Sequence, residues 1–494
     1  MTSKPQQINV ALVGLGPHAR RIYYPFLASL HEEGKLSIKL VVDLENKKDT
    51  IREYLHGQPA QPDKILLLNT KEQIHPLKTD PEFDRLLDEL NITHVIISSE
   101  PKSHKAYLTT CIKKSLAVLV DKPITSPAGL MSSSIDQVRK ASNQIVSDVT
   151  ELINLSKQYP ASRVLVQAQR RNHEGYSQVL KCLNDVVAEY GVPITYINIH
   201  HSDGMWNMPD EYFSRENHPY KYGYGKLMHS GYHFVDLLTR IEGINRQLTT
   251  KRPDSVSVFN QFLRPIDHIS LVQPKDYETL FSEKGFAQYS QKKSLDVMST
   301  FGELDNYSQI QFSKGDKVVT TAQMSLMQSG FSQRSWTELP KDTYKSNGRV
   351  RHESVNIHVG PLLNLQVHSY QESQEHEYTQ DKQSVGGKDH FDIYIFRNSN
   401  LLGGKPFELI KFGDRHAANH RKSKGYLGHN EHARLRTLRE LLGNSVSESE
   451  LSSHLVSVSL TAAICYNQGL QQQGLVPYSK YTMSQLRKGL KIDA

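Results

Sequence analysis

The chain has 494 residues, more than one hydrophobic core usually supports, so we expect at least two domains. Lysine and arginine outnumber aspartate and glutamate by 59 to 52, and the net charge of +7 is too small for this length to indicate a nucleic-acid partner. Cys111, Cys182 and Cys465 are far apart and odd in number, which excludes a disulfide framework and a paired-cysteine zinc or redox motif.

Residues 1–7 are polar and lead directly into an apolar strand. No apolar run in the chain reaches the 18 residues that a membrane helix needs, and the polar start has no signal-peptide core. We therefore expect a cytoplasmic protein without a membrane partner.

A glycine-rich turn follows the first apolar run, Ile8–Val13. Gly14 allows a tight turn, Gly16 lets the backbone come close to a pyrophosphate, and the helix that follows supplies N–H groups and a positive dipole end. Ala19 stands where a small residue lets the helix pack closely against the strand. A turn of this kind can also bind nothing, so the motif alone leaves both interpretations open. Its candidate cofactor contacts are Gly14, Gly16, Pro17, His18 and Ala19.

A second apolar strand, Leu40–Asp43, ends in a carboxylate. A carboxylate at this point can accept hydrogen bonds from the ribose of NAD, and it repels the phosphate that NADP carries there. Lys47 and Lys48 follow closely and leave NADP possible. Asp43 can also be a simple cap at the end of the strand. We expect NAD as the cofactor.

Two more apolar strands, Thr93–Ser98 and Ala117–Val120, continue the alternation of strands and helices to about residue 125. This alternation predicts a parallel sheet. Lys122 follows the second of these strands and precedes a proline. A lysine that is partly desolvated at the end of a buried strand can have its pKa lowered enough to relay a proton, whereas most Lys-Pro pairs are surface residues before a turn.

With Pro101 and His104 in the loop after Thr93–Ser98, this part of the chain resembles the Gfo/Idh/MocA oxidoreductases. The nucleotide-binding Rossmann domain of that family carries a Thr-Pro-x-x-x-His-like loop and a Glu-Lys-Pro signature, which reads Asp-Lys-Pro here. The resemblance implies that Lys122 lies beside the nicotinamide and the substrate hydroxyl, and that the peptide before Pro123 is cis. It adds Ser99, Pro101, His104, Asp121, Lys122 and Pro123 to the candidate cofactor contacts.

The segment Gly223–Leu238 resembles a helix of the family's second domain, which reads roughly Gly-Gly-Gly-x-Leu-x-Asp-x-Gly-x-His-x-x-Asp-Leu. His233 matches the family's catalytic histidine, and His229 stands where most members have an aspartate. The two are four residues apart, so on a helix both side chains point to one side. Either His229 relays a proton with His233, or the site has left dehydrogenase chemistry. The candidate catalytic residues are Lys122, His229 and His233.

Candidate substrate residues come from three places in the sequence. Arg170 and Arg171 follow the strand Arg163–Gln169 and resemble a pocket loop of the family, and we expect one of the two in the site although such pairs usually lie at the surface. Trp206 and Tyr232 offer flat apolar faces for a sugar, and either can instead belong to the core.

We expect an α/β dinucleotide-binding domain over residues 1–128 and an α+β domain over residues 129–494. Alternation with period two in Ile194–His201, Val318–Met324 and Val355–Val359 predicts one large, open and mostly antiparallel sheet in the second domain. A last helix is expected over residues 451–475. We also expect a homodimer or homotetramer that forms through this sheet.

Three long polar segments, around residues 265–300, 330–350 and 370–435, are interpreted as insertions that cover the pocket or extend an oligomer contact. Within the third, His416 and His420, with His429 and His432 after them, resemble a metal-binding pattern. Because no carboxylates or cysteines accompany them at ligand spacing, the pattern favours a hydrated loop. The pair His229 and His233 also lacks a third ligand in its motif, so no metal is expected at either place.

These features predict an NAD(P)-dependent oxidoreductase that transfers a hydride between nicotinamide and a carbohydrate, polyol or sugar derivative. A different class stays open, because some relatives of the family are cofactor-sensing regulators or use NAD for glycosidic cleavage. A regulator would bind the cofactor without turnover, and a glycosidase would release a sugar without net formation of NADH.

Overall fold

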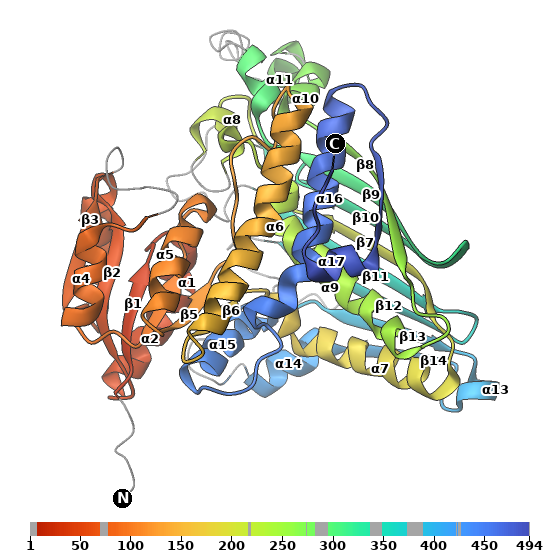
Figure 1. The fold of residues 1–494 in the computed structure, drawn as a ribbon, viewed down its shortest axis with the longest axis horizontal. Coiled ribbons are helices and arrows are strands. Elements are labelled where there is room, and N and C mark those ends of the chain that lie inside the picture. The colour runs from red at the N-terminus through yellow and green to blue at the C-terminus, as the bar shows by residue number, and fades with distance from the viewer. Residues whose placement is uncertain are drawn as a thin grey trace, which may run out of the picture. The chain divides into compact units, whose positions relative to one another are not determined.

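A computed structural model describes residues 7–69, 78–215, 219–272, 274–281, 295–335, 348–372, 389–420, 422 and 426–493. The chain divides into two compact units, each built around its own sheet (Figure 1). The first unit contains residues 1–126, 147–173 and 430–455, and the second contains residues 127–146, 174–429 and 456–494.

The first unit is built on a parallel sheet with the strand order β3-β2-β1-β4-β5-β6 among the described residues. The order reverses between β1 and β4, and ligands of open parallel sheets bind beyond the carboxyl ends of the strands at such a reversal. The predicted dinucleotide-binding fold is therefore confirmed. The strands are β1 (Asn9–Val13), β2 (Ser37–Leu44), β3 (Lys64–Leu68), β4 (His94–Ile97), β5 (Ala117–Val120) and β6 (Arg163–Val166).

The core of this unit forms because its central strands are almost wholly apolar, as expected of strands that are covered on both faces. Val10, Leu12 and Val41 pack in one cluster with Tyr23 and Leu27, which lie on the second helix after the glycine turn. The strand β6 lies beyond residue 128, so the sheet includes a segment that the sequence analysis assigned to the second domain. The helices of this unit include α1 (Pro17–Arg21), α2 (Tyr23–Glu32), α3 (Lys48–His56), α4 (Pro81–Glu89), α5 (Pro101–Lys113) and most of α15 (His429–Leu442).

The second unit is built on a larger sheet, with the order β14-β13-β12-β11-β7-β10-β9-β8-β15 in the described part of the chain. Only the central pair β7 and β10 is parallel, and the other neighbours are antiparallel, which confirms the predicted large and mostly antiparallel sheet. The strands are β7 (Ile194–Ser202), β8 (Ser255–Leu263), β9 (Asp305–Lys314), β10 (Lys317–Met327), β11 (Val350–Val359), β12 (Leu363–Glu372), β13 (Asp392–Arg397), β14 (Phe407–Lys411) and β15 (Tyr478–Thr482).

Helices cover one face of this sheet. Figure 1 shows α7 (Glu174–Tyr190), α9 (Tyr232–Gly243) and α16 (Leu455–Gln472) on the same side. Ile197 and Ile199 of β7 are fully buried, whereas Asn198 and His200 between them are only half-buried, as expected when successive side chains point to opposite faces. The face that carries Asn198 and His200 has no helix on it among the described residues, and we call it the open face.

Two interpretations of the polar segments are wrong. The stretch 370–435 was interpreted as an insertion, but its described residues include β13 and β14 of the sheet, because the alternating side chains of these strands pack on one face only. Residues 416–420, whose histidines were interpreted as part of a hydrated loop, lie in α14 (Phe412–His420). Parts of the segments 265–300, 330–350 and 370–435 lie outside the described residues.

The expected final helix is present as a short 3₁₀ turn, Leu451–His454, followed by α16. The helix α6 (Ile135–Gln158) precedes β6 in the chain. Among the helices that the structure describes, none combines the length and the apolar character that a membrane span requires.

Candidate functional site

The glycine turn lies at the carboxyl end of β1. Gly14 has a φ of +88°, and a Cβ built on it would lie 2.6 Å from the carbonyl oxygen of Ser98. Only glycine therefore fits at this position, because a side chain would be strained and would collide with backbone. Gly16 differs, since a Cβ there would meet nothing within 4 Å. The space over Gly16 is open, which is what the close approach of a pyrophosphate requires.

The helix that follows starts at Pro17, and the backbone of Gly16 is extended at the cap. Proline suits this first position because its missing N–H would have no partner within the helix. Ala19 is fully buried against the core, in agreement with the predicted close packing of helix and strand. The residues present therefore fit a dinucleotide cofactor at this turn.

Asp43 closes the turn from the end of β2. One carboxylate oxygen accepts a hydrogen bond from the backbone N–H of Leu15 at 2.7 Å, and the other accepts one from Leu44 at 2.7 Å. Each oxygen keeps a further lone pair for a ribose hydroxyl. Of the two lysines that left NADP possible, Lys48 pairs with Glu45 at 3.2 Å.

Asp121, at the end of β5, ties three elements of the first unit together. Its carboxylate accepts hydrogen bonds from the hydroxyl of Tyr23 at 2.5 Å and from that of Ser98 at 2.6 Å. His18 lies near the same carboxylate, with its Nε2 3.9 Å from Oδ2. Burial lowers the pKa of His18 to about 4, so its imidazole is neutral at neutral pH despite this acid.

The peptide between Lys122 and Pro123 is cis, as predicted. His104 holds the loop that contains it: its Nδ1 lies 3.0 Å from the carbonyl oxygen of Pro123, and its Nε2 lies 2.9 Å from that of Ser99. Burial lowers the pKa of His104, and a neutral ring donates to one of these two carbonyls. His104 thus positions the lysine loop from within the fold, while Pro101 begins α5 as its first residue.

Arg170 and Arg171 are both buried, at 4% and 5% exposure, instead of lying at the surface. The guanidinium of Arg171 donates to the carbonyl of Glu448 at 2.6 Å and to the hydroxyl and the carbonyl of Ser453. Arg171 therefore holds the loop before the 3₁₀ turn at residue 451. A substrate role stays a prediction for both.

In the second unit, His229 and His233 lie where the helix changes its winding. Residues Leu227–Gly231 form a π-helical turn, which widens the hydrogen-bonded ring from i→i+4 to i→i+5, and α9 begins at Tyr232. The predicted helix is therefore present with a π turn at its start, and the expectation that the side chains of residues 229 and 233 point to one side stays a prediction. Such π turns occur frequently at functional sites. His229 packs edge-on against the rings of Tyr220 and Tyr224, with centroids 5.7 and 5.3 Å away, and both histidines are buried.

A buried ionic cluster next to this turn was not predicted. The ammonium group of Lys226, a side chain with no exposed surface, lies 2.5 Å from Oδ2 of Asp203 and 2.9 Å from Nδ1 of His201. The same carboxylate accepts a hydrogen bond from the hydroxyl of Ser230 at 2.8 Å and pairs with Arg349. Buried charges are stable only when they are paired and hydrogen-bonded in this way.

Sequence signals for this cluster existed. Lys226 lies inside the segment that resembles the family helix, and Asp203 follows the end of β7 by one residue. A lysine within an otherwise apolar and glycine-rich segment needs a partner if the segment is buried. Spacing along the chain does not identify that partner, because Asp203 is 23 residues away.

Trp206 and Tyr232 are in the second unit as well. The Trp206 ring packs against Phe281 and Tyr277 of α11 (Pro274–Phe281), with centroids 5.2 and 6.3 Å away. Tyr232, the first residue of α9, is 2% exposed. Both positions suit the alternative that these rings belong to the core, and their contact with a substrate stays a prediction.

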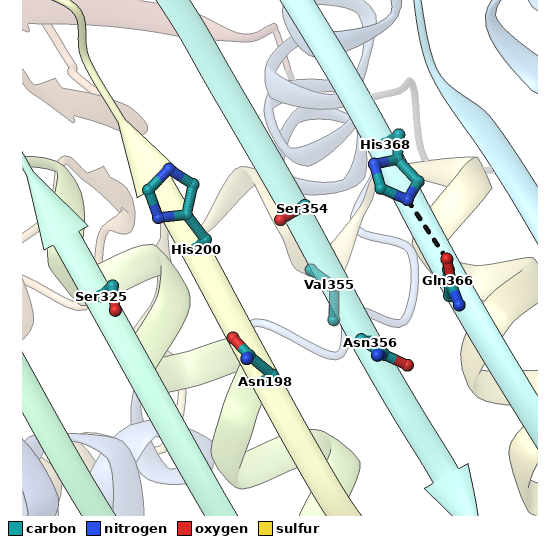
Figure 2. A pocket seen from close by; sticks show the side chains of 8 residues that line it. All are labelled: Asn198, His200, Ser325, Ser354, Val355, Asn356, Gln366 and His368. Carbon is teal, nitrogen blue, oxygen red and sulfur yellow. Dashed lines mark hydrogen bonds between the residues drawn. The ribbon is translucent and has the colours of Figure 1, made fainter. Parts of the chain in front are cut away.

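A polar hollow of about 320 Å³ lies on the open face of the large sheet (Figure 2). Figure 2 shows His200 on one strand and His368 on another, with Ser354 and Asn356 on the strand between them. Burial lowers the pKa of both histidines, so they are neutral hydrogen-bonding groups. His201, the neighbour of His200 on β7, points to the opposite face and joins the Lys226 cluster, so the hollow and that cluster are on different faces. The lining residues are Asn198, His200, Ser325, Ser354, Val355, Asn356, Gln366 and His368.

Comparisons with known proteins agree with the geometry of the first unit. The family model described as "Oxidoreductase family, NAD-binding Rossmann fold" matches residues 8–149. No curated protein matches the sequence of the chain.

Solved structures match nearly the whole chain at low identity. An oxidoreductase from Agrobacterium radiobacter in complex with NAD⁺, L-tartaric acid and magnesium is 11% identical, with a TM-score of 0.53 over 97% of this chain and 99% of that one. The aldose-aldose oxidoreductase from Caulobacter crescentus, complexed with glycerol, is 11% identical, with a TM-score of 0.51 over 97% and 100%. The WlbA dehydrogenase from Bordetella pertussis, with NADH and UDP-GlcNAcA, is 12% identical, with a TM-score of 0.51 over 97% and 99%. At these identities the likeness shows the fold alone.

Proposed function

We propose that this chain is an NAD(P)-dependent oxidoreductase of carbohydrates, polyols or sugar derivatives, because residues 8–149 match the model of an NAD-binding oxidoreductase family. The observation that carries the proposal is the glycine turn at the switch point of the parallel sheet. There Gly14 makes the tight turn, Gly16 leaves open space, and Asp43 accepts a hydrogen bond from the backbone of Leu15.

Bound NAD(P) supplies the acceptor or donor of a hydride. The chain's own residues must then hold the substrate hydroxyl and move its proton. Lys122 of the first unit is the proposed group for this task, since burial lowers the pKa of an ammonium group toward neutral pH and lets it exchange a proton there. A catalytic role of His233 in the second unit is a separate prediction. His104 supports the loop of Lys122 through the carbonyl of Pro123.

A sugar-like substrate is supported by two considerations. Structures with the same fold were solved with L-tartaric acid, glycerol or UDP-GlcNAcA, which are all rich in hydroxyl or carboxylate groups. In the second unit, His229 lies on a π turn, a kind of turn that occurs frequently at functional sites.

The test is turnover with a panel of aldoses, polyols and uronic acids. Purified protein is incubated with NAD or NADP, and the formation of the reduced cofactor is followed by absorbance. We expect substrate-dependent reduction that Lys122→Ala lowers and that Lys113→Ala, an exposed lysine of α5, leaves unchanged. Cofactor binding without turnover on any member of the panel would favour a regulator, and sugar release from a chromogenic glycoside without net NADH would favour a glycosidase.

We also propose that the open face of the large sheet contacts a second copy of the chain, giving a homodimer or homotetramer. Phe396, Phe407 and Leu409 of the neighbouring strands β13 and β14 are 40–47% exposed, and their register places them on the same face as Gln366 and His368. Exposed apolar side chains grouped in this way are typical of interaction surfaces. Leu409→Arg should shift the protein toward the monomer in sedimentation velocity. A wild-type chain that sediments as a monomer at all concentrations would refute the proposal.

A further inference from the structure

Three side chains of the metal-binding type come together in the second unit, at a place the sequence analysis interpreted as a loop. Glu174 is the first residue of α7, and His416 and His420 are on α14. One ligand atom from each lies within 4.8 Å of the others. A carboxylate oxygen and two imidazole nitrogens form a donor set that proteins use for zinc and related divalent ions.

The helix α14 brings the two histidines together. They are four residues apart, so their side chains lie on the same face of the helix. Their ring centroids are 4.4 Å apart. In the sequence, the four-residue spacing of these histidines suggested no ligand pattern. Because the segment is helical, that spacing places the two imidazoles next to each other.

Glu174 faces His416 across a gap that no hydrogen bond spans. The distance from Nε2 of His416 to Oε2 of Glu174 is 4.0 Å, beyond the reach of a hydrogen bond. Ligands at 2.0–2.2 Å from a tetrahedral ion lie about 3.3 Å apart, so an ion would draw the two atoms together by less than 1 Å. The side chain of Glu174 is 40% exposed, whereas that of His416 is 2% exposed.

A chain of hydrogen bonds fixes which nitrogen of His416 faces Glu174. The hydroxyl of Tyr426 donates to Oδ1 of Asp389 at 3.1 Å, and Nδ1 of His416 lies 3.1 Å from the same hydroxyl oxygen. Since the tyrosine hydrogen is used for Asp389, its oxygen accepts from the Nδ1–H of His416. The lone pair is then on Nε2. Metal-bound histidines are oriented in this way, through a hydrogen bond from the other ring nitrogen toward a carboxylate.

Backbone packing fixes the position of Asp389, the last member of this series of hydrogen bonds. A Cβ on Gly413 would overlap the carbonyl oxygen of Asp389, so the start of α14 packs directly against that segment. The N–H of Gly413 also donates to the carbonyl of Phe391 at 3.0 Å.

We propose that Glu174, His416 and His420 bind a divalent transition-metal ion of the Zn²⁺ type. The ion connects the N-terminus of α7 to α14 and leaves room in its coordination for water. This metal site is separate from the proposed hydride transfer, and binding leaves the oxidation state of the ion unchanged.

The test is the binding of Zn²⁺ to tag-free full-length protein that has been treated with a chelator. Isothermal titration calorimetry and metal analysis after dialysis should give one equivalent per chain, and Zn²⁺ should raise the melting temperature. His420→Ala and Glu174→Gln should each weaken binding by at least about 100-fold. Tyr426→Phe, which keeps all three ligands, should weaken it by about 10–100-fold, the usual effect of removing the partner of a ligand. His56→Ala, an exposed histidine of α3, is the matched control and should bind as the wild type does.

Circular dichroism and titration with NADH show that each variant is folded. The absence of one bound equivalent in the wild type would overturn the proposal. Wild-type affinity in folded His420→Ala and Glu174→Gln would overturn it as well, because the metal would then be bound elsewhere.

Discussion

Substitutions at the two glycines of the cofactor turn should act differently. Replacement of Gly14 should lower the stability of the fold, and replacement of Gly16 should lower the affinity for the cofactor. At Gly14, alanine adopts a left-handed conformation that costs about 1–2 kcal/mol, and its Cβ lies 2.6 Å from the Ser98 carbonyl oxygen, which adds about 1–3 kcal/mol of overpacking. Gly14→Ala should therefore lower the free energy of unfolding by about 2–5 kcal/mol.

At Gly16 the added atoms meet open space and φ is −74°, so Gly16→Val should change the free energy of unfolding by no more than about 1 kcal/mol. Its side chain fills the space that the pyrophosphate needs. We expect cofactor affinity to fall by at least about 100-fold, or about 2.7 kcal/mol. Urea unfolding measures stability, and fluorescence titration with NADH measures affinity. A folded Gly16→Val variant that binds NADH as tightly as the wild type would refute the assignment of the turn.

Four further substitutions test other parts of the account. Asp43→Ser should raise the kcat/KM ratio of NADP to NAD by about tenfold, equivalent to about 1.4 kcal/mol, because a carboxylate that repels a phosphate is gone; an unchanged ratio would contradict this. Lys122→Ala should lower kcat by ~10²–10⁴-fold while NADH still binds, and wild-type turnover would rule out the lysine. Burial raises the pKa of Glu242 from 4.5 to about 7, so the folded state holds the carboxyl proton more tightly than the unfolded chain does. The free energy of unfolding should therefore fall on the order of 3 kcal/mol as the pH rises from 4.5 to 7. Urea unfolding at several pH values should show a smaller decline for Glu242→Gln, and an equal decline would exclude Glu242 as its source. Asp203→Asn should cost about 3–5 kcal/mol in the same assay because it leaves the charge of Lys226 buried without its carboxylate, and a change below 1 kcal/mol would show that the pair is not needed.

Local patterns predicted the first unit well, because a dinucleotide turn is defined by residues that are adjacent in the chain. The strand before Gly14 and the acid at the end of the second strand are properties of short segments, and the cis peptide before Pro123 was implied by the family resemblance. The parallel sheet follows from the alternation of strands and helices. The strand β6 was assigned to the wrong unit because a long helix separates it in sequence from its partner β5.

The second unit was predicted less completely, since its important contacts join distant residues. The partner of Lys226 is 23 residues away, and no sequence pattern distinguishes the π turn Leu227–Gly231 from a regular helical turn. The segment of α14 is polar and carries several histidines, a composition that also suits a loop, and it is the packing of Phe412 and Gly413 against residues 389–391 that fixes the helix.

Transfer of deuterium from substrate carbon to cofactor tests the central claim most directly. A sugar found active in the panel is labelled with deuterium at the carbon that bears the reacting hydroxyl, and the nicotinamide cofactor is analysed by mass spectrometry after one turnover. The account predicts one deuterium in the reduced cofactor, and none when Lys122→Ala is used over the same time. Product formed without deuterium in the cofactor would contradict hydride transfer by this protein.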